Sequence, residues 1–241
     1  MPADARSILD QLEIVSRERA LRLVDPSLGS SVHAVKQYQQ SRFSRTYADL
    51  LSSARYALAA RFFLDELYGP RDFSERDAQF ARVVPALVRL FPQEIVDTVH
   101  TLAQLHALSE GLDSEMGRRL QGREVDRAGY IAAWQGTGDP AGRERQIVLT
   151  LSIGRSLDRF TRKPFLRGTL HLMRGPARAA GLPALQQFLE TGFDTFKAMG
   201  GADEFLANVG QRERDLASAL FAARNDADPA TQALGPLGQL P

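Results

Sequence analysis

Apolar side chains recur every three or four residues along most of the chain, which is the period of an amphipathic α-helix. Ile8, Leu12 and Val15 begin this pattern, and similar stripes follow as far as about residue 223. Alternating patterns typical of strands are scarce. The pattern predicts an all-α fold, a compact globule of about nine or ten helices with no sheet.

Proline, glycine and capping residues indicate where these helices begin and end. The residue before a proline disfavours the helical conformation, so the first helix is expected to stop at Asp25 and residues 26–31 to form a polar loop. Ser74 has Asp77 three residues further on, a spacing close to that of a capping box. Arg76 and Asp77 belong to a mixed-charge stretch that we interpret as a solvated helix entry.

The domain boundaries follow from composition. Residues 136–142 hold three glycines and a proline and are the best candidate for an internal boundary. We expect a single helical domain over residues 1–224, because each side of that segment contains only a few helices with broad apolar faces. Residues 225–241 are rich in Ala, Pro, Gly and Gln, which predicts a disordered tail.

Composition excludes several classes of protein and site. The chain has 241 residues and a net charge of +1, which argues against non-specific binding of nucleic acid. It contains no cysteine, so disulfides and thiolate metal sites are excluded. The first ten residues have no apolar signal-peptide core, and no apolar run is long enough to span a bilayer. We therefore expect a cytoplasmic protein that does not bind membranes.

Several segments resemble an uncharacterised, all-helical family of proteobacterial proteins. The strongest is FFLDELYGP (Phe62 to Pro70), which continues as RDFSERDAQFARVVPALVRLFP to Pro92. Weaker similarity extends to LHALSEGLD (Leu105 to Asp113) and KAMGGADEFLANVGQRE (Lys197 to Glu213). The family has no assigned activity, so the resemblance implies a bacterial helical protein and transfers no functional residue.

One polar cluster is expected on an apolar helix face. On a helical wheel, His106, Glu110 and Asp113 project from the side that carries Ile95 and Val99. Glu110 follows His106 by four residues, so the two side chains can face each other. The cluster can be a ligand-binding site at a cavity, either a metal half-site or an acid–base pair of His106 with Glu110. The alternative, which we favour, is a hydrogen-bonded histidine near the end of the core stripe, with a solvated C-terminal half of the helix.

His171 and an aromatic segment are weaker candidates. His171 lies beside Met173 on an apolar helix and can be a haem ligand, although a core or boundary position is favoured. The aromatic-rich segment can form a pocket wall, but we favour a core helix that ends in a sharp turn; its residues are Phe62, Phe63, Leu67, Tyr68 and Phe73.

Basic residues gather between residues 155 and 178, and Asp158 is the one acidic residue that opposes them locally. Arg155, Arg159 and Arg162 share one helical face, which can bind an anionic ligand or an acidic partner. A plain solvated face is favoured over this.

The sequence leaves three functions open. We expect first a regulatory or protein-interaction protein, whose partner is another protein or a second copy of this chain. The second is a protein that binds a small ligand, haem or another tetrapyrrole included, anchored by His106 or His171. The third is an enzyme that uses His106 with Glu110 and Asp113. We lean against an enzyme and expect no metal site, because the short motifs of phosphate-binding loops, serine hydrolases and zinc peptidases do not occur.

Overall fold

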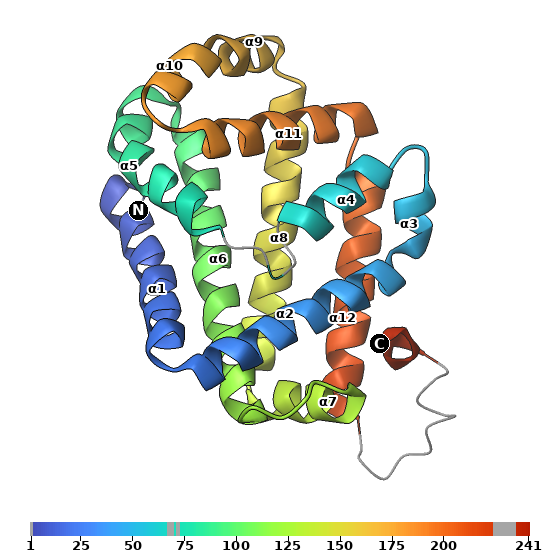
Figure 1. The fold of residues 1–241 in the computed structure, drawn as a ribbon. Helices are drawn as coiled ribbons and strands as arrows, with labels where there is room; N and C mark the ends of the chain where they lie inside the picture. The colour runs from blue at the N-terminus through green and yellow to red at the C-terminus, as the bar shows by residue number, and fades with distance from the viewer. Residues whose placement is uncertain (1, 67–69, 71–72, 224–234) are drawn as a thin grey trace.

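The computed structural model describes residues 2–66, 70, 73–223 and 235–241, and its regular structure there is entirely helical (Figure 1). The fold class is therefore all-α, as predicted, although these residues divide into more helices than expected. The elements are α1 (Ala5–Val24), α2 (Pro26–Thr46), α3 (Ala48–Ser52), α4 (Ala57–Glu66), α5 (Ser74–Leu90), α6 (Gln93–Leu120), α7 (Arg127–Gly136), α8 (Pro140–Thr161), α9 (Pro164–Leu172), α10 (Arg174–Ala179), α11 (Pro183–Met199), α12 (Asp203–Ala222) and the 3-10 helix η1 (Pro236–Gln239). Within the described ranges, no helix is long and apolar enough to cross a bilayer.

Three long helices, α6, α8 and α12, run side by side through the molecule (Figure 1). Helices α1 and α2 pack against α6, and α7 contacts both α6 and α12. Helix α11 crosses the opposite end of the bundle, where it packs on α4, α5 and α8, with α9 and α10 against it. This arrangement brings α1, α2, α5, α6, α8 and α11 around a common interior.

Helices α8 and α12 approach closely where each has a glycine. A Cβ on Gly154 of α8 would lie 2.5 Å from Leu206 Cδ2, and one on Gly210 of α12 would lie 2.8 Å from Leu151 Cδ1. A methyl group at either glycine would force the facing leucine to move, since side-chain carbons do not approach this closely. The paired glycines therefore set the spacing of α8 and α12.

The loop expected at residues 26–31 is wrong, because α2 already begins at Pro26. The Asp25 side chain accepts hydrogen bonds from the backbone N–H groups of Ser27 (3.0 Å) and Leu28 (3.1 Å). Proline is compatible with the first helical position, where its missing N–H would have no partner in any case. The cap thus turns the chain directly from α1 into α2.

The expected boundary at residues 136–142 is a short connection between α7 and α8. Asp139 caps α8 by accepting a hydrogen bond from the backbone N–H of Gly142 at 2.8 Å. Helix α12 contacts both α7 and α8, so it bridges this connection. The expectation of one domain over residues 1–224 stays a prediction.

The structure differs from the expected disordered tail at residues 235–241, which contain the 3-10 helix η1. Leu237 and Leu240 are buried in a cluster with Tyr38, Tyr130 and Trp134. The guanidinium of Arg45 donates a hydrogen bond to the carbonyl of Leu240 at 2.9 Å. Two leucines in a Gly- and Pro-rich stretch are enough to anchor it to an apolar surface. The rest of the predicted tail lies outside the described residues.

Candidate functional site

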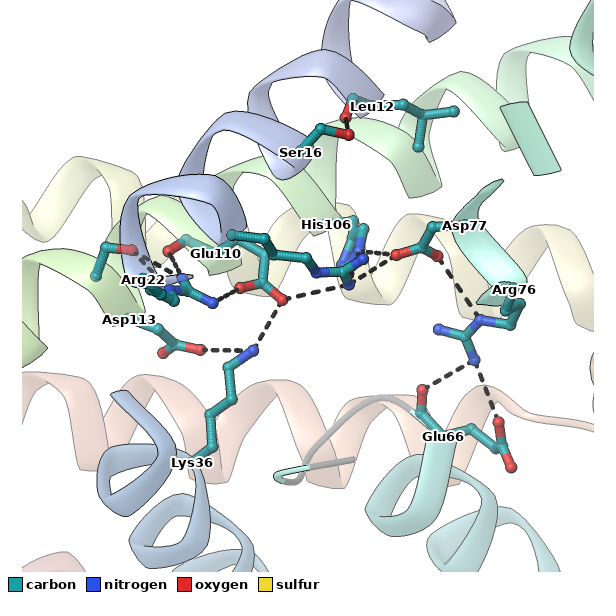
Figure 2. Close-up of polar contacts among 12 residues, drawn as sticks. Leu12, Ser16, Arg22, Lys36, Glu66, Arg76, Asp77, His106, Glu110 and Asp113 are labelled. Carbon is teal, nitrogen blue, oxygen red and sulfur yellow. Dashed lines mark hydrogen bonds and ion pairs between the residues drawn. The ribbon is translucent and has the colours of Figure 1, made fainter. Parts of the chain in front are cut away.

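A cavity of about 140 Å³ lies between α1, α2, α4, α5, α6, α8 and α11. One part of its wall is apolar and includes Leu12, Phe80, Val99, Leu102, Leu185 and Leu189. The rest of the wall is polar and carries several charged side chains, shown in Figure 2. Apolar walls with a few converging polar groups are typical of sites that bind small molecules.

The three predicted residues of α6 all lie at this wall. His106, Glu110 and Asp113 line the cavity, and Glu110 and Asp113 are buried. Their position follows from the helical period, which places them on the side of Val99. The structure therefore brings the predicted cluster together, although it gives His106 a different partner from the one expected.

The partner of His106 is Asp77 at the start of α5. Asp77 Oδ2 lies 2.8 Å from His106 Nε2, whereas no hydrogen bond joins His106 to Glu110 among the described residues. A carboxylate can only accept, so Nε2–H donates to Asp77, and Arg19 Nη2 lies 3.3 Å from the same nitrogen. In the neutral imidazole, this tautomer leaves the lone pair on Nδ1, which has no hydrogen-bond partner in the described part of the chain.

Asp77 is held by charges from three helices. Arg19 Nη2 donates to the same Oδ2 atom at 2.7 Å, and Arg76 Nε lies 3.8 Å from Oδ1. Burial alone would raise the pKa of Asp77, but the hydrogen bond with His106 and the charges of Arg19 and Arg76 bring that pKa below its ordinary value. Asp77 is therefore ionised and orients the imidazole.

Glu110 is bound by two cations from the neighbouring helices. Lys36 Nζ donates to Oε1 at 2.8 Å, and Arg22 pairs with Oε2 (Figure 2). Arg22 also donates to the Glu110 carbonyl at 2.8 Å and to Ser114 Oγ at 2.8 Å. Burial alone would raise the pKa of Glu110, but the charges of Lys36 and Arg22 lower it to about 2.

Asp113 has the weakest partners of the buried carboxylates at the wall. Gln39 Nε2 donates to Oδ1 at 3.1 Å, and the nearest cation, Lys36 Nζ, lies 4.0 Å from Oδ2. That separation exceeds hydrogen-bond length. Burial raises the pKa of Asp113, because the nearby charge of Lys36 compensates for only part of the lost hydration.

At the other end of the polar wall, Arg76 lies between two aromatic rings. Its guanidinium carbon is 4.0 Å from the ring centroid of Phe73 and 4.5 Å from that of Phe188. Nη1 donates to Glu66 Oε2 at 3.2 Å. Burial lowers the pKa of Arg76, although Asp77 and Glu66 oppose this. The ion pair and the rings hold the guanidinium at the cavity wall.

The solvated helix entry predicted around Arg76 and Asp77 is wrong, since both side chains are only 14–15% exposed. The cap predicted at Ser74 is wrong as well, because the cap residue of α5 is Phe73, and it makes no side-chain cap bond. Without a capping role, Asp77 is free to point inward. Because the spacing from Ser74 resembles a capping box, it assigns Asp77 to the helix entry and does not predict the contact with His106.

Sequence reasoning also missed Arg19 and Arg22, although α1 carries a signal for them. Ile8, Leu12 and Val15 are buried, and the same spacing of three and four residues continues to Arg19 and Arg22. Basic residues in line with a buried stripe must meet acidic partners, because an unpaired buried charge is costly. Extending the stripe past Val15 would have predicted charged residues facing the interior.

His171 does not belong to the site. It is exposed on α9 and does not line the cavity. The predicted core or boundary position is therefore wrong, and of the two alternative anchors, His106 and His171, only His106 lines the cavity. In the aromatic segment, Phe73 lines the cavity and Phe62 and Phe63 lie in the core. Leu67 and Tyr68 lie outside the described residues.

The basic face of α8 meets acidic residues from elsewhere. Arg159 and Lys163 both pair with Glu94 of α6, at 3.4 and 2.5 Å, and Arg162 pairs with Asp158 at 2.5 Å. Arg155 is exposed on the same helix. Asp158 is the acidic residue that lies near these basic residues in the sequence. The fold brings a second one, Glu94 of α6, into contact with them. These pairs weaken the case for an anion site at Arg155, Arg159 and Arg162.

No group of three or more His, Asp or Glu side chains within the described ranges has the arrangement of a metal site. His106 Nε2 is engaged by Asp77, so only Nδ1 could coordinate a metal ion, and no such group of ligands in these ranges includes it. The arrangement at the cavity can instead bind a small molecule and exchange a proton through Nδ1.

Comparison with known proteins adds one finding. A family model described as Domain of unknown function (DUF8198) matches residues 18–227. That range contains every polar residue of the cavity wall. No curated protein and no solved structure matches the chain.

Proposed function

We propose that this chain, which belongs to the family Domain of unknown function (DUF8198), binds a small amphipathic molecule in the cavity beside α6. The observation that carries the proposal is the cavity itself, which has an apolar wall on one side and buried charged groups on the other. Of the three functions that the sequence leaves open, the geometry favours the second. A protein partner or a second copy of the chain stays a prediction.

The polar wall of this cavity is costly to build. Glu110 and Asp113 are buried there, and burying a charged group carries a desolvation penalty. Such costs are expected at binding sites, where local rules of good packing give way to function. A ligand that contacts these groups would recover part of the penalty.

The size of the cavity limits the ligand. A cavity of about 150 Å³ accommodates benzene, so the buried part of the ligand is about one ring or a branched alkyl group. A tetrapyrrole is far larger, and the His106 Nε2 atom that would coordinate iron faces Asp77. The geometry therefore favours a small molecule over the haem that the sequence left open.

The test is binding of benzyl alcohol, followed by calorimetry and by the shift in melting temperature. Leu102→Trp fills the cavity from α6, and we expect it to weaken binding at least tenfold. Val148→Trp is the matched control, because Val148 is 46% exposed on α8 and lies outside the cavity. Circular dichroism checks that both variants fold. Absence of binding to the wild type, or equal binding to Leu102→Trp, would count decisively against the proposal.

A second candidate function, acid–base catalysis, is supported by the Asp77–His106 pair. A carboxylate that fixes the Nε2–H tautomer leaves Nδ1 available as a general base. If the bound molecule is a substrate, we expect His106→Gln to abolish turnover while binding persists. Loss of binding and turnover together would assign His106 to binding alone.

A further inference from the structure

Asp113 is the group at the cavity wall that lacks a close counter-ion. Its side chain is 9% exposed, and it lines the cavity from α6. Oδ1 accepts one hydrogen bond, from Gln39 at 3.1 Å. Oδ2 has Lys36 Nζ as its nearest cation, at 4.0 Å, and no hydrogen-bond donor reaches it from the described residues.

The cations around the cavity are already engaged by other carboxylates. Lys36 binds Glu110 at 2.8 Å, which is much shorter than its distance from Asp113. Arg19 pairs with Asp77 at 2.7 Å, and Arg76 pairs with Glu66 at 3.2 Å. Arg22 pairs with the other carboxylate oxygen of Glu110, Oε2. The four cations balance four carboxylates in number, but their close contacts are with Glu110, Asp77 and Glu66. Asp113 is the one of the four that no cation of the described residues reaches within hydrogen-bond distance.

Because Asp113 has no cation at hydrogen-bond distance in the described part of the chain, we propose that the cavity is selective for a ligand with a protonated amine, and that this ammonium group pairs with Asp113. The inference rests on the proposed function and adds the charge of the ligand. An ammonium group supplies hydrogen-bond donors and a close positive charge to Oδ2 together. An anion at the same position would lie against the Asp113 carboxylate, whose nearest cation, Lys36, is 4.0 Å away and bound to Glu110, so like charges would repel there.

The apolar wall defines the rest of the ligand. Val99, Leu102 and Leu185 line the cavity and offer no hydrogen-bonding side chain. The ligand is therefore an amine on a ring or branched alkyl body, joined by a short spacer. Burial raises the pKa of Asp113 in the free protein, and an ammonium at hydrogen-bond distance would favour its ionised form.

Three ligands of equal size and different charge test this inference: benzylamine, benzyl alcohol and benzoate, titrated at pH 7 by calorimetry. We expect benzylamine to bind at least tenfold more tightly than benzyl alcohol, and benzoate not to bind. Asp113→Asn should remove the advantage of the amine and leave the affinity for benzyl alcohol within about threefold. Glu115→Gln is the control, because Glu115 is on α6 but pairs with Arg118 and Arg119 at the surface.

The outcomes separate the two proposals. Equal binding of amine and alcohol, or tighter binding of benzoate, would overturn amine selectivity and leave the cavity as a binding site. Binding that Leu102→Trp does not weaken would place the ligands elsewhere and overturn both proposals, as would absence of binding by all three. The comparison of the three ligands on the wild type decides the inference even if Asp113→Asn does not fold.

Discussion

Asp77 Oδ2 lies 2.8 Å from Nε2 of His106, and this contact joins the first turn of α5 to the middle of α6. The carboxylate is held in place by Arg19 from α1, which donates to the same oxygen at 2.7 Å. Three helices thus meet at one oxygen atom beside the cavity. The orientation of the imidazole is consequently fixed by residues distant in sequence.

The first prediction concerns the tautomer of His106. Because Asp77 accepts a hydrogen bond, we expect neutral His106 to carry its proton on Nε2, and Asp77→Asn to weaken this preference. Two-bond ¹H–¹⁵N correlation spectra distinguish the tautomers. His33 is the internal control, since it is exposed and the substitution should not change its spectrum. A neutral wild-type His106 with its proton on Nδ1 would contradict the geometry, since Nε2 would then face Asp77 without a hydrogen.

The second prediction concerns the stability that Glu110 provides. Glu110→Gln leaves Arg22 and Lys36 without their close counter-ion, so we expect the free energy of unfolding to fall by about 3–5 kcal/mol. Glu115→Gln on the same helix removes surface pairs and should cost less than about 1 kcal/mol. Urea unfolding measures both values. Equal small losses would mean that Glu110 is more solvated than its 5% exposed side chain indicates.

The third prediction is the pH dependence of that difference. The pKa of Glu110 is about 2 in the folded protein and 4.5 as the ordinary value, so the unfolded chain binds the proton more tightly. Its stabilising effect is therefore complete above about pH 4.5 and is lost as the pH falls toward 2, with a total of about 3 kcal/mol. Protonated Glu110 resembles Gln, so the stability difference between the wild type and Glu110→Gln should shrink on acidification.

Unfolding at several pH values between about 5 and 3 checks this, and using the difference between two proteins removes the contributions of groups that Glu110 does not affect. Asp113 acts in the opposite direction, because burial and the charge of Glu110 raise its pKa; the part due to burial is common to both proteins. A difference that stays constant, or grows as the pH falls, would show that the pKa of Glu110 is not lowered.

The helical period was sufficient to place residues that share one helix. It put His106, Glu110 and Asp113 on the side of α6 that the structure turns toward the cavity, because the angle between side chains follows from their spacing. It also predicted the all-α class. Such features depend on neighbours within one or two turns.

The partners across helices could not be predicted in this way. Asp77 is 29 residues from His106, Lys36 is 74 from Glu110, and the chain between them can be arranged in many ways. The same limit applies to Glu94, which neutralises Arg159 and Lys163 from another helix. The capping motif near Ser74 is a local pattern that fits a surface position. It therefore gave no indication that tertiary structure turns Asp77 toward the interior.

The last prediction tests the segment that composition assigned to a disordered tail. Leu240 is 2% exposed and packs in the cluster that contains Trp134, the single tryptophan of the chain. Leu240→Ala removes buried methyl groups, so we expect it to cost about 2–3 kcal/mol in urea unfolding followed by Trp134 fluorescence. Leu23→Ala is the control, because Leu23 is 84% exposed and its loss should cost less than about 0.5 kcal/mol. If both substitutions had the same small effect, residues 235–241 would not pack against α2 and α12, and the expectation from composition would have been correct. A clear loss for Leu240→Ala alone would show that two leucines outweigh the Gly and Pro content around them, because burial of a leucine offsets the conformational entropy of ordering a few residues.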